Sequence, residues 1–211
     1  MRAPGSPPAW LTSAKAKPTW MLILALPAVA LLGLALNDGL GANPAEALTR
    51  QSGEWALRGL ILVLLIRPLQ VWTRWGVWLR FRRATGVAVF VYGAMHMLCW
   101  AWFEQGLEWE DLVSDIAKRP FILVGVLTLT VMLPLAVTSN TWSLRTLGSA
   151  AWQRLHRLVY VCAPLAVLHF FWMRAGKQRF TEVWVYGGLL AALLLWRVWA
   201  ARAPRQGKRA S

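Results

Sequence analysis

The chain has 211 residues, of which 57% are hydrophobic and only 15% are charged. A soluble domain carries about 25% charged residues, so the composition indicates a membrane protein. The formal net charge of +14 could suggest nucleic-acid binding, but the basic residues lie in short clusters between apolar runs, and we expect no nucleic-acid partner.

Six apolar runs follow one another along the chain, and each is close to the length of about 20 residues that a spanning helix needs. Each run is expected to be a continuous helix, because lipid offers no partner for free backbone groups. We expect the first run to be retained rather than cleaved as a signal peptide, since a long proline-rich leader precedes it. The fold class is therefore all-α, a polytopic membrane protein with six transmembrane helices. The runs are Trp20–Leu36, Trp55–Trp72, Thr85–Phe103, Pro120–Thr138, Trp152–Trp172 and Val183–Trp199.

The segments outside the six runs are polar. Residues 1–18 are expected to form a disordered cytoplasmic N-terminus, residues 19–201 the six-helix transmembrane domain, and residues 202–211 a basic cytoplasmic tail. The loop Gly39–Gly53 is predicted to be flexible. The acidic loop Glu104–Asp115 is either a solvated connection or a docking surface for an outer partner.

Charge along the chain predicts the orientation of the helices. Most of the basic residues fall in the segments that face one side if both termini lie inside, and all nine acidic residues fall on the other side. Cytoplasmic segments of membrane proteins are enriched in lysine and arginine, so both termini are predicted to be cytoplasmic. The chain is therefore predicted to cross a membrane several times, with the lipid bilayer as the surrounding partner.

The chain has three histidines, His96, His156 and His169, and all three lie in apolar runs. An ionisable side chain within a membrane marks a candidate functional site, and imidazole is the usual protein ligand of heme iron. Counted from Arg83 and Arg157, His96 and His169 lie about 20 Å and about 18 Å along their helices. Two imidazoles at one depth on different helices predict a heme held between them. Since the chain has no CxxCH motif, this heme would be heme b.

His156 lies beside Arg157 at the predicted inner boundary. It could bind the iron of a second heme, whose other ligand would be a different residue type or absent. On a straight helix His156 and His169 would be about 140° apart, and whether Pro164 changes this stays open. Arg82, Arg83, Arg154 and Arg157 cluster near His156, and they are either positive-inside anchors or residues that pair with heme propionates or a flavin phosphate.

The candidate site residues are thus His96, His156 and His169 as iron ligands and Arg82 and Arg157 as cofactor-binding residues, and none is predicted to be catalytic. The chain has neither a G-x-G-x-x-G turn nor a phosphate-binding P-loop. Electrons would therefore enter from a membrane quinol or a separate flavin reductase.

Two sequence blocks resemble the MsrQ (YedZ) family, part of the ferric-reductase-like transmembrane superfamily, over roughly Arg67 to Trp199. The first block is Arg82–Gly86, followed by His96. The second is Leu133–Ser139, Leu147–Gly148, Trp152, Leu155–Tyr160 and His169.

The resemblance implies heme b held at His96, His156 and His169, together with bound FMN. It further implies that electrons pass from the quinone pool or a cytosolic flavin reductase to a periplasmic molybdopterin subunit. That subunit would reduce methionine sulfoxide in oxidised proteins. The chain would then be the electron-transfer subunit of an oxidoreductase complex rather than its catalytic subunit.

Two alternatives stay open at this stage. One is a transmembrane ferric or cupric reductase-type cytochrome that acts on an outer metal ion. The other is a non-redox transporter or structural membrane protein, in which the histidines relay protons or bind helices together. A heme absorption band in purified membranes would separate the redox functions from the second alternative.

Overall fold

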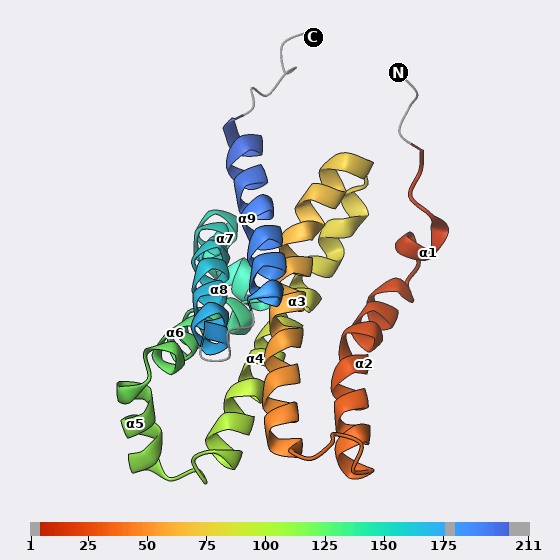
Figure 1. Cartoon of the computed structure of the whole chain (residues 1–211). Coiled ribbons are helices and arrows are strands. Elements are labelled where there is room, and N and C mark those ends of the chain that lie inside the picture. Colours follow the sequence, from red (N-terminus) through yellow and green to blue (C-terminus); the bar gives the residue numbers. More distant parts are fainter. Residues whose placement is uncertain (1–4, 176–179, 203–211) are drawn as a thin grey trace, which may run out of the picture.

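The computed structural model describes residues 5–175 and 180–202, and within them all regular structure is helical (Figure 1). Six segments are long and apolar enough to cross a membrane, which confirms the prediction of an all-α protein with six spans. The helices are α1 (Ala9–Thr12), α2 (Ala16–Leu36), α3 (Pro44–Thr73), η1 (Gly76–Phe81), α4 (Arg82–Phe103), α5 (Trp109–Lys118), α6 (Pro120–Val137), α7 (Thr141–His156), α8 (Val159–Ala175) and α9 (Thr181–Arg202).

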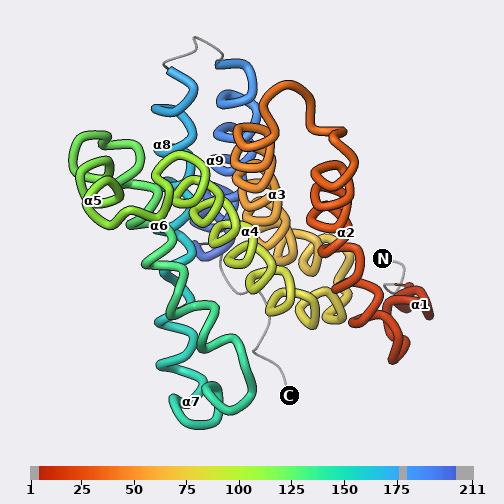
Figure 2. The backbone as a smooth tube through the Cα atoms, turned by 90° about the horizontal axis from the view of Figure 1, so that it is seen from below, coloured from red at the N-terminus to blue at the C-terminus, as the bar shows by residue number. Residues whose placement is uncertain are grey.

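Helix α3 is the centre of the bundle, with α2, α4 and α9 around it (Figure 2). It packs most extensively on α4, and α6 packs in the same way on α8. Its apolar side chains form the main core with residues of α4, α8 and α9; Leu60 and Leu64 are almost completely buried there. The molecule therefore contains two tightly packed helix pairs, α3 with α4 and α6 with α8.

Helix α3 begins earlier than the hydropathy predicted. The side chain of Asn43 accepts a hydrogen bond from the amide of Glu46 at 3.1 Å, and Pro44 occupies the first helical turn. An asparagine cap followed by proline is a strong start signal for a helix. The prediction of a flexible loop over Gly39–Gly53 was therefore wrong from Pro44 onward.

The fifth predicted span is interrupted. Instead of one helix over Trp152–Trp172, the chain forms α7, which ends at His156, and α8, which begins at Val159. The amides of Arg157 and Leu158 bond to carbonyls three residues back, a tight turn between the two helices. His156 and His169 thus lie on different helices, and the angle expected for one straight helix does not apply. Residues 153–157 are mostly polar, so ending the helix here keeps them out of the apolar span.

The N-terminal leader is partly ordered, in contrast to the disorder expected over residues 1–18. Helix α1 forms within it, and Leu11 is only 1% exposed. Leu11 packs with Ile66 and Phe81 in a small core near η1. The proline content suggested disorder, but the buried leucine gives this segment an anchor. The tail predicted for residues 202–211 lies outside the described residues beyond Arg202.

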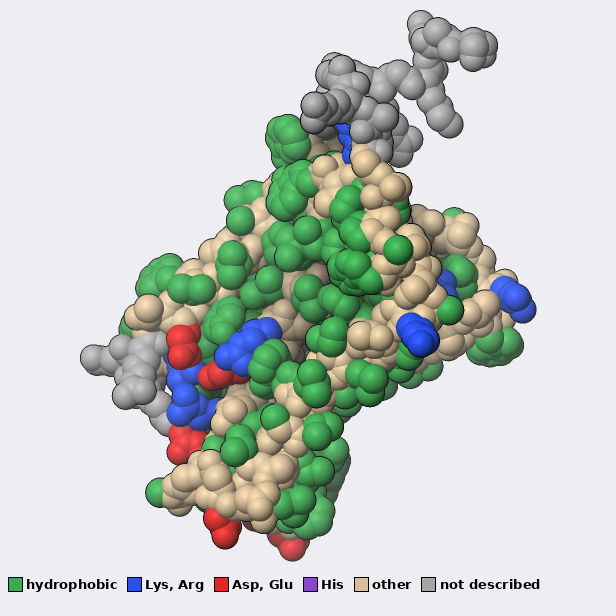
Figure 3. Space-filling view, turned by 90° about the vertical axis from the view of Figure 1, so that its right-hand side faces the viewer, with side chains coloured by type: hydrophobic (Ala, Val, Ile, Leu, Met, Phe, Trp, Pro, Cys, Tyr) green, Lys and Arg blue, Asp and Glu red, His purple; other side chains and the backbone are tan. Residues whose placement is uncertain are grey.

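Acidic side chains are distributed unevenly along the bundle. Acidic side chains gather at the end that carries α5 (Figure 3). Helix α1 and the last turn of α9 both lie toward the opposite end, on different sides of the bundle (Figure 1). This arrangement follows from an even number of spans. Which end faces the cytoplasm stays a prediction from the charge pattern.

The hydroxyl of Tyr92 on α4 is inserted into the backbone of α2. It donates to the carbonyl of Leu24 at 2.8 Å and accepts from the amide of Ala28 at 3.0 Å. These two groups would bond to each other in an uninterrupted helix, and Pro27 lies beside the gap. In lipid no water could bond to this carbonyl and amide, so the Tyr92 hydroxyl serves as their polar partner.

We predict that Tyr92→Phe lowers the free energy of unfolding by about 1–3 kcal/mol, because it leaves a carbonyl and an amide of α2 unpaired in the membrane. Titration of the purified protein with SDS in mixed micelles measures this difference. An unfolding curve unchanged from that of the wild type would contradict the role assigned to the hydroxyl.

Candidate functional site

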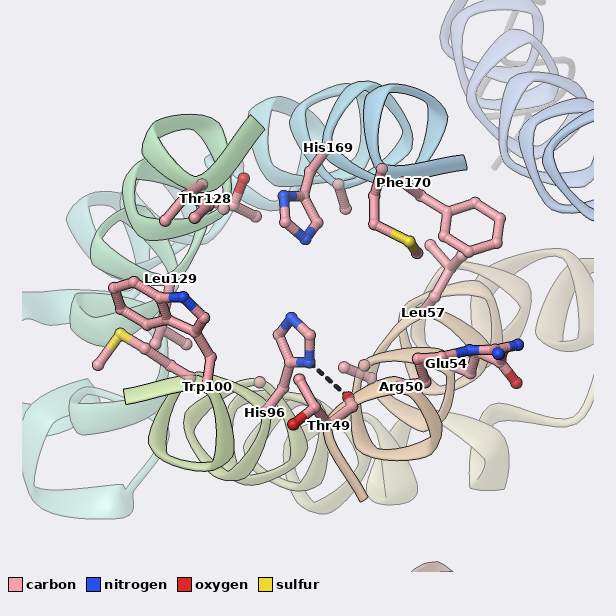
Figure 4. A pocket seen from close by; sticks show the side chains of 18 of the residues that line it. Thr49, Arg50, Glu54, Leu57, His96, Trp100, Thr128, Leu129, His169 and Phe170 are labelled. Atoms are coloured by element: carbon pink, nitrogen blue, oxygen red, sulfur yellow. Dashed lines mark hydrogen bonds between the residues drawn. The ribbon is translucent and has the colours of Figure 1, made fainter. Parts of the chain in front are cut away.

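A cavity of about 620 Å³ lies between the two helix pairs, within the size range of small-molecule and cofactor sites. Its walls are mostly apolar and come from α3, α4, α6 and α8. His96 projects into it from α4 and His169 from α8, on opposite walls (Figure 4). Their ring centroids are 5.9 Å apart, and the two ring planes form an angle of 77°. The structure thus brings together the two histidines that the sequence placed at one depth.

Each of these imidazoles is oriented by a backbone carbonyl on a neighbouring helix. The Nδ1 atom of His96 lies 2.7 Å from the carbonyl oxygen of Thr49 on α3 (Figure 4), and Nδ1 of His169 lies 2.6 Å from that of Phe121 on α6. A carbonyl oxygen only accepts, so Nδ1 carries the proton in both rings. The Nε2 lone pair of each neutral ring is then free to bind a metal.

The cavity suits iron that is already held in a macrocycle. Among the described residues, no group of three or more histidine, cysteine or acidic side chains is arranged to hold a metal ion. Two facing imidazoles would hold such a group, whose macrocycle would supply the remaining ligands of the iron itself. The apolar walls match the porphyrin faces. The residues present therefore fit a heme, with His96 and His169 as the residues that would hold it.

An ionic cluster links α3 to α8 and α9 at the rim of this cavity. Glu54 on α3 lines the cavity and pairs with Arg174 of α8 and Arg58 of α3, both at 3.0 Å. Arg174 is only 2% exposed and also pairs with Glu182 of α9. Its guanidinium lies 5.2 Å from the ring centroid of Phe170. Two arginines and two carboxylates balance each other, so the cluster joins the helix pairs without leaving a net charge beside the cavity.

His156 lines a second cavity, of about 340 Å³, near the start of α4. Its ring stacks on Trp152 with centroids 3.7 Å apart, and its Nδ1 lies 3.0 Å from the Trp152 carbonyl oxygen. Its Nε2 is 3.4 Å from the hydroxyl of Ser139. That hydroxyl donates its only proton to the carbonyl of Leu135 at 2.7 Å. His156 thus lines the cavity with its ring held between the Trp152 indole, a backbone carbonyl and the Ser139 hydroxyl.

The second cavity is electropositive. Arg82 and Arg83 both line it, and none of the described residues around it is a carboxylate. The guanidinium of Arg83 lies 5.4 Å from the ring centroid of Trp152. Of the two arginines predicted to bind a cofactor, the structure brings Arg82 to His156, whereas Arg157 is exposed and does not line the cavity. An anionic group with a flat ring matches this lining.

The two cavities are neighbours. Leu60, Val89 and Met132 line both, so their side chains lie between the site of His96 and His169 and that of His156. The three residues come from α3, α4 and α6. The predicted inner and outer sites therefore adjoin across a thin apolar wall, which suits transfer of electrons but not of ions.

Several residues of these sites were not predicted. The carbonyls of Thr49 and Phe121 have no signature in a sequence, because every residue carries one. Glu54 and Arg174 lie near the ends of spans, where charged residues usually meet water, so nothing along the chain marks them as partners. The Trp152–His156 spacing of one helical turn is a signal that could have revealed the stacked pair.

Comparison with known proteins gives consistent results. Residues 52–167 match the family model described as "Ferric reductase like transmembrane component". The chain is 48% identical over 190 residues to the "Protein-methionine-sulfoxide reductase heme-binding subunit MsrQ" of Polaromonas naphthalenivorans, covering 90% of this chain and 87% of that protein. The proteins of the same name from Bordetella pertussis and Caulobacter vibrioides are each 44% identical, covering 86% and 77% of this chain and 88% and 77% of their own length. No solved structure matches.

We predict that Glu54→Gln lowers the free energy of unfolding by about 3 kcal/mol, because Arg174 would keep a buried charge with one carboxylate fewer. Arg50→Gln is the matched control. Arg50 also lines the cavity and pairs with Glu46 at 3.8 Å, but both side chains are partly exposed, and loss of such an ion pair costs about 0–1 kcal/mol. Equal losses in the two variants, measured by SDS titration, would show that the Glu54–Arg174 pair does not hold the helix pairs together.

Proposed function

The chain belongs to the MsrQ family, and on that premise we propose that it is a membrane b-type cytochrome that carries electrons across the bilayer to a methionine-sulfoxide reductase. The observation that carries the proposal is the facing pair His96 and His169, each with Nδ1 bonded to a carbonyl and Nε2 free. The similarity to heme-binding subunits favours this function over a metal-ion reductase or a non-redox membrane protein.

A heme bound between these histidines supplies reversible one-electron chemistry at its iron. The two imidazoles fix its position, and their hydrogen bonds to the carbonyls of Thr49 and Phe121 hold both rings in the ligating tautomer and raise their basicity. The apolar walls exclude water and, with the neutral ionic cluster at the rim, set the local dielectric that tunes the potential.

We propose that the end carrying α5 and the acidic side chains faces the periplasm. The outer partner there is a periplasmic molybdopterin subunit that reduces methionine sulfoxide in proteins. Reduction of one sulfoxide to the thioether takes two electrons and two protons and releases water. The membrane chain would therefore pass two electrons, one after the other, to its periplasmic partner for each sulfoxide. The amphipathic helix α5 and its exposed Trp109 lie where such a partner would approach.

At the opposite end, electrons enter from the quinone pool or a cytosolic flavin reductase. The cavity around His156 is our candidate entry site, and FMN is the candidate occupant besides a second heme. Arg82 and Arg83 suit a phosphate, and the Trp152 ring suits stacking on a flat heterocycle. Arg157, on the exposed side of the same turn, would contribute long-range charge rather than direct contact.

The first test is heme ligation. We predict that His96→Ala and His169→Ala each abolish the absorption spectrum of the heme in the large cavity, because each removes one axial ligand. His156→Ala is the control and should keep that heme. Optical spectra and heme content of the purified variants decide the matter. A wild-type spectrum in either of the first two variants would refute the pairing.

The second test is orientation. In a background without Cys99 and Cys162, a cysteine at exposed Glu110 of α5 should react with an impermeant maleimide in intact spheroplasts. Glu110 lies in a helix and tolerates this substitution, whereas Gly106 in the preceding loop has a φ of 58° that would strain a cysteine. A cysteine at exposed Ser149 of α7 is the control and should react only after lysis. The reverse pattern would invert the proposed direction of transfer.

The third test addresses electron entry. We predict that His156→Ala slows reduction of the heme in the large cavity by the inner donor while leaving that heme bound. Arg157→Ala should have a smaller effect, since an exposed ionic contact is worth about 0–1 kcal/mol. Stopped-flow reduction, with heme content measured alongside, separates the two effects. An unchanged rate in His156→Ala would mean that electrons reach the large cavity by another route.

A further inference from the structure

The two histidines of the large cavity are supported in the same way, by a carbonyl and a glycine one helical turn apart. On α3, Thr49 accepts the hydrogen bond of His96, and Gly53 follows four residues later; on α6, Phe121 accepts that of His169, and Gly125 follows four residues later. The carbonyl precedes its histidine by 47 residues in the first case and by 48 in the second. Each helix pair therefore builds one half of the site by the same construction.

Both glycines lie in direct contact with the imidazoles. A Cβ atom added to Gly53 would lie 2.9 Å from Nδ1 and 3.1 Å from Cε1 of His96. A Cβ atom added to Gly125 would lie 2.9 Å from both Cε1 and Nδ1 of His169. Such contacts are closer than real Cβ atoms tolerate, so a side chain at either position would force the ring to move.

The position of the glycines has a physical reason. In a helix the carbonyl of residue i already accepts the amide of residue i+4, and its second lone pair is the one left for an imidazole. The side chain of residue i+4 flanks the approach to that lone pair. With glycine at i+4, the His96 and His169 rings come close enough to the helix to bond to the carbonyls of Thr49 and Phe121.

We propose that Gly53 and Gly125 are positioning residues that set the orientation of the two imidazoles, and with it the direction of their Nε2 atoms and the 77° angle between the ring planes. The inference rests on the proposed function in that the imidazoles bind heme iron. An added methyl group would meet Nδ1, the atom that donates to the carbonyl. The ring could avoid it only by weakening that hydrogen bond and turning Nε2 away.

The test compares Gly53→Ala and Gly125→Ala with two control glycines. Gly59→Ala also introduces a close contact on α3, 2.8 Å from Cγ2 of Val89, but touches no histidine; Gly188→Ala on α9 meets nothing within 4 Å. Hemin titration, the midpoint potential and the low-spin ferric EPR signal are measured on each purified protein. The g values of that signal respond to the angle between the two imidazole planes.

We expect Gly53→Ala and Gly125→Ala to bind heme about 10–100-fold more weakly, as when a ligand's supporting partner is lost, and to show shifted g values and potential. The two controls should keep the wild-type g values. Wild-type affinity, g values and potential in both test variants would overturn the proposal. So would equal shifts in Gly59→Ala, because the effect would then come from helix packing alone.

A second measurement needs no heme and applies even if a variant loads poorly. Gly53→Ala is combined with His96→Ala, and the heme-free melting temperatures of the two single variants and the double variant are compared. We expect Gly53→Ala to lower the melting temperature when His96 is present and not when it is absent. Equal losses in both backgrounds would overturn the contact. Failure of the wild type to bind heme would instead overturn the proposed function. The comparison of heme-free melting temperatures tests the glycine–histidine contact independently of that outcome.

Discussion

The large cavity depends on hydrogen bonds from two imidazoles to backbone carbonyls within the membrane. A buried N–H without a partner is costly where no water is present, so the Nδ1 proton of each histidine has to be accepted by the protein itself. Thr49 and Phe121 provide the acceptors without any side-chain group. Once Nδ1 is satisfied in this way, the only unpaired nitrogen of each ring faces the cavity, and the chemistry of the site follows from that.

The same constraint shapes the rest of the bundle. Tyr92 fills the opened rung of α2, and the guanidinium of Arg174 is held by two carboxylates and an aromatic ring. The Tyr92 hydrogen bonds and the Arg174 ion pairs each join two helices, so each fixes the position of one helix along the other, which apolar packing alone does not specify. The Glu54–Arg174 pair is the clearest case, because it joins the two helix pairs that each carry one half of the large cavity.

The break between α7 and α8 determines where His156 lies in the second cavity. Ending α7 at His156 lets that ring stack on Trp152 and turns it toward Arg82 and Arg83 at the start of α4. His96 and His169 bond to backbone carbonyls and face a mostly apolar cavity, whereas His156 lies beside Arg82 and Arg83. Two sites of different polarity, separated by the side chains of Leu60, Val89 and Met132, suit a protein that accepts electrons at one end and releases them at the other.

The sequence by itself determined the number of spans, their approximate limits, the gathering of acidic residues toward one end and the common depth of His96 and His169. These properties depend on hydropathy and on the fixed rise of a helix, which are local and can be counted along the chain. Only the tertiary structure decided that the apolar run Trp152–Trp172 is divided, and that of the arginines near His156 Arg82 and Arg83 line the second cavity but Arg157 does not. It also decided which carbonyls and glycines support the imidazoles. Those features depend on the rotation of each helix about its axis and on which helices become neighbours, and both are set by contacts between residues far apart in the chain.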